Sequence, residues 1–202
     1  MNCNNDEIYR LIEFAVDMYD NDIDINEVLY IIHKAVDLSK EYLDKNFCKE
    51  NRIALYYSII MECDFMLGTT GGNRVEQVIE ALIYSLSKEI NHEFDETIMA
   101  LYAYSLRINY RCLKNKDDNN SAQKAYDLIR DARWKYNLLF IKSDLNNDIE
   151  KAKEYYYMFE LTTIDSIEAC QKADMPKKEA LIKKQLNEMR KMYSIKYKAI
   201  DE

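Results

Sequence analysis

Two short acidic segments have the residue types and spacing of calcium-binding loops. Residues 20–24 read DNDID and residues 144–148 read DLNND, so that side-chain oxygens stand at alternate positions. A calcium loop of this kind also needs a glycine at its sixth position and a bidentate glutamate at its twelfth. Both segments lack the glycine, and their twelfth positions are Ile31 and Tyr155. We therefore predict helix caps here, because carboxylates accept hydrogen bonds from the free N–H groups of a helix start.

The chain has two histidines, and neither predicts a catalytic site. His33 lies within a predicted helix without a catalytic neighbour. His92 precedes the acidic segment 93–96, which could hold a metal weakly but is better interpreted as a charged helix start. No Ser–His–Asp or Cys–His arrangement can be assembled, so we predict no catalytic residue, no metal ligand and no cofactor. An enzyme site built from distant residues such as Glu62, Asp64 and His92 stays as an alternative.

All three glycines lie in one segment, residues 68–72 (GTTGG). A phosphate-binding P-loop would need a Lys followed by Ser or Thr, and a strand before the loop. Neither is present, so the segment is predicted to be a turn between helices. An anion resting at the N-terminus of the following helix is the alternative.

The composition predicts an all-α protein. Only three of 202 residues are Gly and one is Pro, while apolar residues make up 48% and charged residues 32%. Scarcity of both helix breakers favours long helices. The net charge of −8 argues against direct nucleic-acid binding, which needs a basic surface. The charge is uneven, since residues 1–175 carry −12 and residues 176–202 carry +4.

Cysteine usage and hydropathy predict a cytoplasmic protein. The five cysteines are scattered and form no Cys-x-x-Cys pair, which is typical of free thiols in a reducing compartment. The N-terminus has no basic region followed by an apolar run, as a secretory signal would. The longest apolar stretch, residues 53–61, is too short to span a bilayer, so no membrane association is predicted.

One hydrophobic spacing occurs three times. The three triplets have gaps of four and three residues, which place each on one side of a helix, and they follow one another at 50 and 47 residues: Val28–Ile32–Ala35, Val78–Leu82–Ser85 and Ala125–Ile129–Ala132. The tripeptide Ala54–Tyr56 also recurs as Ala100–Tyr102. Repeats of this length predict stacked helical hairpins. We expect about eight antiparallel helices in a single domain, residues 1–202, with approximate units 6–45, 47–90, 94–141 and 148–199.

The pattern Ala125-x₃-Ile129-x₂-Ala132 resembles the second helix of a tetratricopeptide (TPR) repeat, and residues 32–38 look similar. The resemblance implies a TPR-like α-solenoid. The units of 46–50 residues are longer than the 34 residues of that family, and its Leu-Gly pair and its Pro between repeats are absent. Another array of helical hairpins is the alternative.

The resemblance also implies a binding site, because the first helices of TPR hairpins line a concave face. We expect partner-binding residues on two such helices: Ser58, Met61 and Phe65 on one, and Tyr104, Arg107 and Arg111 on the other. This mixture of aromatic, thioether and guanidinium groups suits an extended or helical peptide with an acidic group. In the alternative interpretation Met61 and Phe65 pack against the first or fifth helix.

The leading functional hypothesis is a non-enzymatic adaptor or regulator that binds a protein or peptide on this concave face. An acidic inhibitor or nucleic-acid mimic, which blocks a basic channel on another protein, is the alternative favoured by the charge of residues 1–175. The apolar ends of a short stack are compatible with a homodimer.

Overall fold

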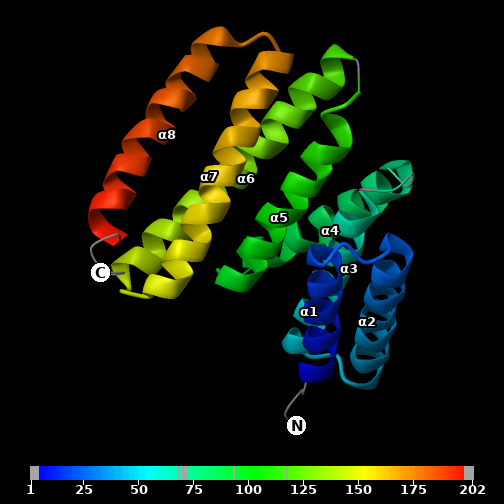
Figure 1. Ribbon diagram of the computed structural model, residues 1–202. Helices are drawn as coiled ribbons and strands as arrows, with labels where there is room; N and C mark the ends of the chain where they lie inside the picture. The colour runs from blue at the N-terminus through cyan, green and yellow to red at the C-terminus, as the bar shows by residue number, and fades with distance from the viewer. Residues whose placement is uncertain (1–4, 68, 70–71, 93, 117, 198–202) are drawn as a thin grey trace. The chain divides into compact units, whose positions relative to one another are not determined.

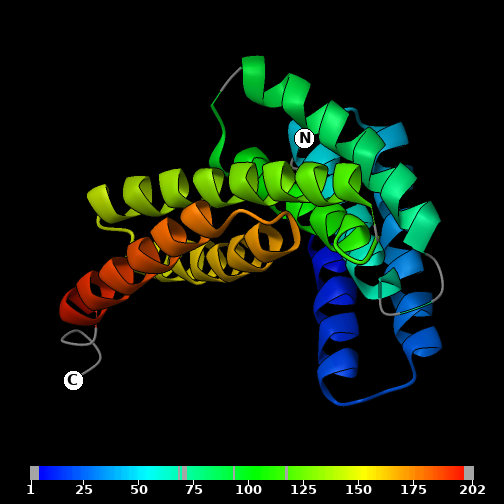
Figure 2. The same ribbon diagram turned by 90° about the horizontal axis from the view of Figure 1, so that it is seen from above.

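The computed structural model describes residues 5–67, 69, 72–92, 94–116 and 118–197, and these ranges form eight α-helices and no strand (Figures 1 and 2). The prediction of an all-α fold with eight helices is confirmed. The helices are α1 (Asp6–Asp20), α2 (Ile25–Lys45), α3 (Lys49–Met66), α4 (Gly72–His92), α5 (Glu96–Leu113), α6 (Asn119–Leu145), α7 (Ile149–Lys172) and α8 (Pro176–Tyr197). No helix within the described ranges combines the length and apolarity needed to cross a membrane.

The chain divides into two compact units, and each is described by itself. Unit 1 comprises residues 1–112 and unit 2 comprises residues 113–202, so the boundary falls inside the third predicted hairpin, 94–141. The charge follows this division. Unit 1 holds 10 Lys and Arg against 20 Asp and Glu, a net −10, whereas unit 2 holds 18 against 16, a net +2.

Aspartate side chains start four of the helices. Asp24 accepts a hydrogen bond from the N–H of Asn26, and Asp148 accepts one from Lys151, so the two calcium-like segments are helix caps as predicted. Helix α6 is capped by Asp118, whose carboxylate accepts from the N–H of Ser121 at 2.8 Å. A carboxylate is favoured at this place because it also interacts with the positive end of the helix dipole.

The same turn ends α1, α6 and α7. In each turn an Asp or Asn adopts a left-handed backbone, with φ of 57° at Asp22, 57° at Asn147 and 51° at Asp174. The next residue then donates its N–H to the carbonyl five residues earlier, as Ile23 does to Met18 at 3.0 Å. This is the Schellman arrangement, and Asp and Asn tolerate the left-handed region better than other residues with a side chain. These turns reverse the chain into hairpins without glycine.

Unit 1 has two hydrophobic clusters that share helix α3. The first joins α1, α2 and α3 through Ile8, Ile12, Ala15, Val28, Ile32, Ala35, Ala54, Met61 and Phe65. The second joins α3, α4 and α5 through Ile60, Cys63, Val75, Ile79, Leu82, Leu86, Ile98, Leu101 and Ile108. Because α3 contributes its opposite sides to the two clusters, it is the central helix of unit 1.

The buried stripe of α4 differs in register from the predicted triplet. Val78 was expected to be interior but is 37% exposed, whereas Val75, Ile79 and Leu82 are buried. This second triplet has the same gaps of four and three residues, and it follows Val28 by 47 residues and precedes Ala125 by 50. With this correction in α4, all members of the three triplets in α2, α4 and α6 are buried.

In unit 2, α7 packs against both α6 and α8. Its tyrosine run is split by helix geometry, since Tyr155 and Tyr156 are buried and Tyr157 is 60% exposed. The ring of Tyr156 stacks on Tyr193 of α8 at 3.7 Å between centroids and meets the edge of Phe140 of α6 at 5.5 Å. Tyrosines therefore serve here as packing residues that join the three helices.

Candidate functional site

Helix α3 contacts a different neighbour on each of its sides. Toward α2 it directs Ser58 and Glu62, and toward α1 it directs Tyr57, whose ring lies 6.1 Å from that of Tyr9. Toward α5 it directs Asp64. The side chains on the sides of α3 that face α1 and α5, and those that they meet on these two helices, are partly exposed. We call this set the α1–α3–α5 surface: Tyr9, Tyr57, Asp64, Tyr104, Arg107 and Arg111.

The α1–α3–α5 surface centres on the carboxylate of Asp64. The hydroxyl of Tyr104 donates to its Oδ2 atom, and Nη1 of Arg111 donates to its Oδ1 atom. The Asp64 side chain is 21% exposed and that of Arg111 is 36% exposed, so the pair is partly shielded from water. Both donors come from α5, so this network connects α3 to α5. It also compensates the charge of Arg111, which was expected to be open to an acidic ligand.

Tyrosines form the apolar part of the same surface. Tyr57 and Tyr104 are half-buried and pack against both hydrophobic clusters of unit 1. Burial raises the pKa of Tyr9 above its usual value, so its hydroxyl stays neutral at physiological pH. Arg107 is one turn from Tyr104 and Arg111 on α5, and it is likewise half-buried. The surface thus combines rigid aromatic rings with two guanidinium groups.

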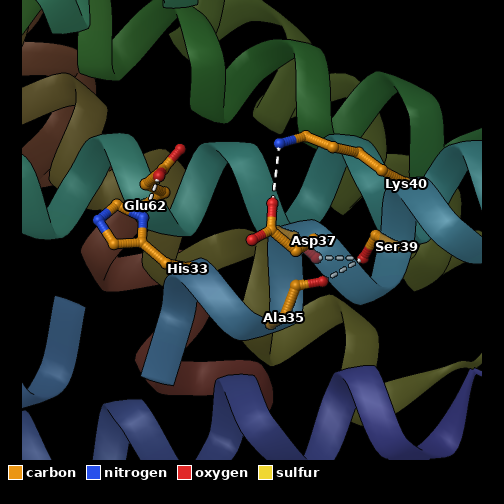
Figure 3. Close-up of polar contacts among 7 residues, drawn as sticks. His33, Ala35, Asp37, Ser39, Lys40 and Glu62 are labelled. Carbon is orange, nitrogen blue, oxygen red and sulfur yellow. Dashed lines mark hydrogen bonds and ion pairs between the residues drawn. The ribbon is translucent and has the colours of Figure 1, made fainter. Parts of the chain in front are cut away.

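Ser58 does not belong to this surface. It is fully buried between α2 and α3, where its hydroxyl lies 2.9 Å from that of Ser39 and 2.8 Å from the carbonyl of Ala54. A small residue here allows the two helices to approach closely. Beside it, Nδ1 of His33 pairs with Glu62 near the solvent (Figure 3). Ser58 was predicted to meet a partner, but its burial leaves no surface for that contact.

Met61 and Phe65, also predicted at the partner-binding face, are only 8% exposed and belong to the cluster of α1, α2 and α3. The ring of Phe65 lies 5.3 Å from Tyr19 at the end of α1. The alternative interpretation, in which these two residues pack against the first helix, therefore describes their environment. Of the six predicted residues, Tyr104, Arg107 and Arg111 keep exposed area.

Further polar contacts fix α4 and α5 against α3. Tyr56 donates to Glu89 of α4 at 2.7 Å, and Lys49 pairs with Asp95, the capping residue of α5, at 2.6 Å. Burial and the neighbouring Glu89 raise the pKa of Tyr56 to about 12. Burial likewise raises the pKa of Cys63 to about 12, so its thiol is a poor nucleophile at neutral pH.

The residues considered for chemistry are not brought together. Within the described ranges, no group of three or more His, Cys, Asp and Glu side chains could hold a metal ion. Glu62 pairs with His33, and Asp64 accepts from Tyr104 and Arg111. His92 is exposed at the end of α4, and Glu93 beside it lies outside the described residues, as do Gly68 and Gly71 of the glycine segment.

No protein-family model, curated protein or solved structure matches this chain. The class that the structure itself defines is an all-α protein of eight helices in two compact units.

Proposed function

We propose that this chain is a non-enzymatic binding protein, an adaptor or regulator, that holds a protein or peptide on the α1–α3–α5 surface. The observation that supports this function is the convergence of Tyr104 and Arg111 of α5 on Asp64 of α3, with all three side chains partly exposed. Tyr and Arg are the residue types that contribute most binding energy at protein interfaces. The repeated hairpins, interpreted as a TPR-like solenoid, give the same surface the role of an inner wall.

The network around Asp64 decides how a ligand would be recognised. Since Asp64 holds Arg111 in place, the guanidinium loses little side-chain entropy on binding. An arginine has five N–H donors, and one of those of Arg111 is used by Asp64, so the group retains donors for a ligand carboxylate. We therefore expect an extended or helical peptide with an aromatic or apolar anchor and one acidic group beside Arg107 and Arg111.

Selection from a random peptide library tests this function. Peptides that bind the wild-type chain are measured against Arg107→Glu, which leaves the Asp64–Arg111 pair in place. We expect at least tenfold weaker binding to this variant. Lys34→Glu on α2 is the control, because Lys34 is exposed in the same unit and the charge change is identical. Peptides that bind both variants equally, or a selection that enriches none, would contradict the proposal.

The acidic inhibitor remains a second candidate because the negative charge is concentrated in unit 1. Residues 6–27 hold eight Asp and Glu, all exposed, and one Arg. Such a surface would attract a basic partner through long-range attraction that salt screens. The same binding measurements separate the two functions. A loss of affinity of 100-fold or more between 50 and 500 mM salt favours the inhibitor, whereas nearly constant affinity favours the adaptor.

A further inference from the structure

Helix α6 has a second apolar side that its neighbours in unit 2 leave exposed. Four of its side chains are strongly exposed: Trp134 by 56%, Leu138 by 36%, Ile141 by 44% and Leu145 by 76%. We call these four residues the α6 seam. Their gaps of four, three and four residues place them on one side of the helix. At 100° per residue the seam lies opposite the buried side, which includes Ala125, Ala132, Tyr136 and Ser143.

The spacing of the seam is that of a helix that packs against another helix. Gaps of four, three and four residues are those of successive core positions in two heptads of a coiled coil. Contiguous exposed apolar residues of this kind mark interaction sites, whereas scattered ones are ordinary. The neighbour that such a seam suits is a helix with a similar apolar stripe.

We propose that this neighbour is α6 of a second copy of the chain, packed antiparallel about a two-fold axis. The gaps read the same in both directions, so an inverted copy presents the same positions in register. Trp134 then lies opposite Leu145 of the second copy, and Leu138 lies opposite Ile141 of the second copy. Each of these pairs joins two side chains of the seam, one from each copy, which is the self-complementarity that a two-fold interface requires.

The charge distribution favours a second copy over a strongly charged partner. Between Asp127 and Leu145, α6 carries four basic and three acidic side chains: Arg130, Arg133, Lys135, Lys142, Asp127, Asp131 and Asp144. Two copies that meet through unit 2 bring together units of net +2, whereas contact through unit 1 would bring two units of net −10 together. Self-association through α6 thus avoids the main repulsion between copies.

The size of the seam predicts a reversible dimer. Eleven residues separate Trp134 from Leu145, a length of about 16 Å along the helix. Stable specific interfaces bury roughly 1,200–2,000 Å² in total, and two helices in contact over this length bury less. We therefore expect monomer and dimer to exchange in the micromolar range. This inference concerns unit 2 and does not depend on the proposed function.

The protein contains a built-in reporter, because Trp134 is its single tryptophan. Sedimentation of the full chain at about 1–200 μM is combined with tryptophan emission and acrylamide quenching over the same concentrations. We expect the mass to rise from 24.1 kDa to twice that value. Along the same transition, the emission should shift to shorter wavelength and the quenching constant should fall at least twofold, as the indole leaves water.

Substitutions test the register. Leu138→Glu should weaken the dimer at least tenfold, while Leu181→Glu at an exposed apolar position of α8 should change it less than twofold. Ile141→Lys should weaken it similarly. Since position 138 faces position 141 of the other copy, a mixture of Leu138→Glu and Ile141→Lys chains should recover the dimer that each lacks alone.

Four results would overturn the proposal: a monomer throughout the concentration range, a shielded tryptophan in a monomer, a dimer in which tryptophan emission does not change, and association that grows beyond a dimer. Failure of the two variants to complement one another would overturn the antiparallel register. Circular dichroism of each variant confirms that the fold is retained, which is expected because all the substituted positions are exposed in the protomer.

Discussion

Replacement of Asp64 by Asn tests whether the network between α3 and α5 stabilises unit 1. The substitution keeps the size of the side chain and removes the charge that accepts from Tyr104 and Arg111. The amide oxygen can still accept from Arg111 and the NH₂ group can donate to the hydroxyl oxygen of Tyr104, but neither contact then involves a carboxylate charge. Asp64→Asn should therefore weaken both contacts at once.

The magnitude follows from the exposure of the pair. Exposed ion pairs contribute about 0–1 kcal/mol, and removal of one partner from a buried pair costs about 3–5 kcal/mol. With side-chain exposures of 21% and 36%, Asp64 and Arg111 lie between these limits. We expect Asp64→Asn to lower the free energy of unfolding by about 2 kcal/mol, of which the hydrogen bond from Tyr104 supplies about 1 kcal/mol.

Urea unfolding followed by circular dichroism measures the free energy, and hydrogen–deuterium exchange of α3 and α5 peptides assigns the change to unit 1. Asp37→Asn is the matched control, because Asp37 pairs with Lys40 on one helix with 78% of its side chain exposed. That variant should change the stability by less than about 0.5 kcal/mol. A double-mutant cycle of Asp64→Asn with Arg111→Gln should give a coupling free energy of about 1 kcal/mol between the two side chains. Additive effects, or equal effects of Asp64→Asn and Asp37→Asn, would refute the reasoning.

Two further predictions follow from groups with altered pKa values. Although burial raises the pKa of Asp95, hydrogen bonds from Lys49 and the N–H of Ile98 outweigh it and leave the pKa below 3.8. Asp95→Asn keeps a capping residue but removes the charge. We expect its free energy of unfolding to lie below that of the wild type by a constant amount above about pH 5, and this difference should shrink as the pH falls through the lowered pKa. Urea unfolding between pH 7 and 3 measures the difference, and a difference independent of pH would contradict the prediction. Because the pKa of Cys63 is raised from 9.0 to about 12, its thiolate fraction at pH 8 is lowered about 10³-fold. Iodoacetamide at pH 8 should therefore modify the partly exposed Cys48 much faster than the buried Cys63. Mass spectrometry of the labelled peptides compares the two rates, and equal labelling would show that Cys63 is accessible.

Helix content and helix ends were predictable because they depend on neighbours in the sequence. Asp24 and Asp148 were recognised as caps, since capping needs only a carboxylate two or three residues before the N–H group that it accepts from. The exposed position of Val78 in α4 was not predictable in this way. Val75, Val78, Ile79 and Leu82 are all apolar, and two overlapping stripes fit them equally well. Packing against α3 and α5 buries Val75 rather than Val78, and that contact is not a property of the local sequence.

In the candidate site, too, the local spacing was predictable from the sequence and the contacts between helices were not. Tyr104, Arg107 and Arg111 were placed on one side of a helix by their spacing. Asp64, the partner of Tyr104 and Arg111, lies 40–47 residues before them, and only the packing of two hairpins brings it to them. The interior position of Ser58 has the same origin, because both neighbouring helices must be placed before its contact with Ser39 can be known. The spacing of the α6 seam is visible in the sequence, but the same helix has a second apolar stripe, and one apolar side is enough to explain an ordinary packed helix.

The two proposals have a joint consequence, because they use different units. A two-fold dimer through α6 of unit 2 would carry two copies of the α1–α3–α5 surface of unit 1. A partner with two suitable segments would then bind the second one as an intramolecular event, and avidity of this kind strengthens binding by 10²–10⁴-fold without any new contact. Weak self-association is enough for this effect, since a bivalent partner itself stabilises the dimer by mass action. Because unit 1 carries a net charge of −10 and unit 2 a net charge of +2, pairing through α6 costs less electrostatic free energy than pairing through unit 1.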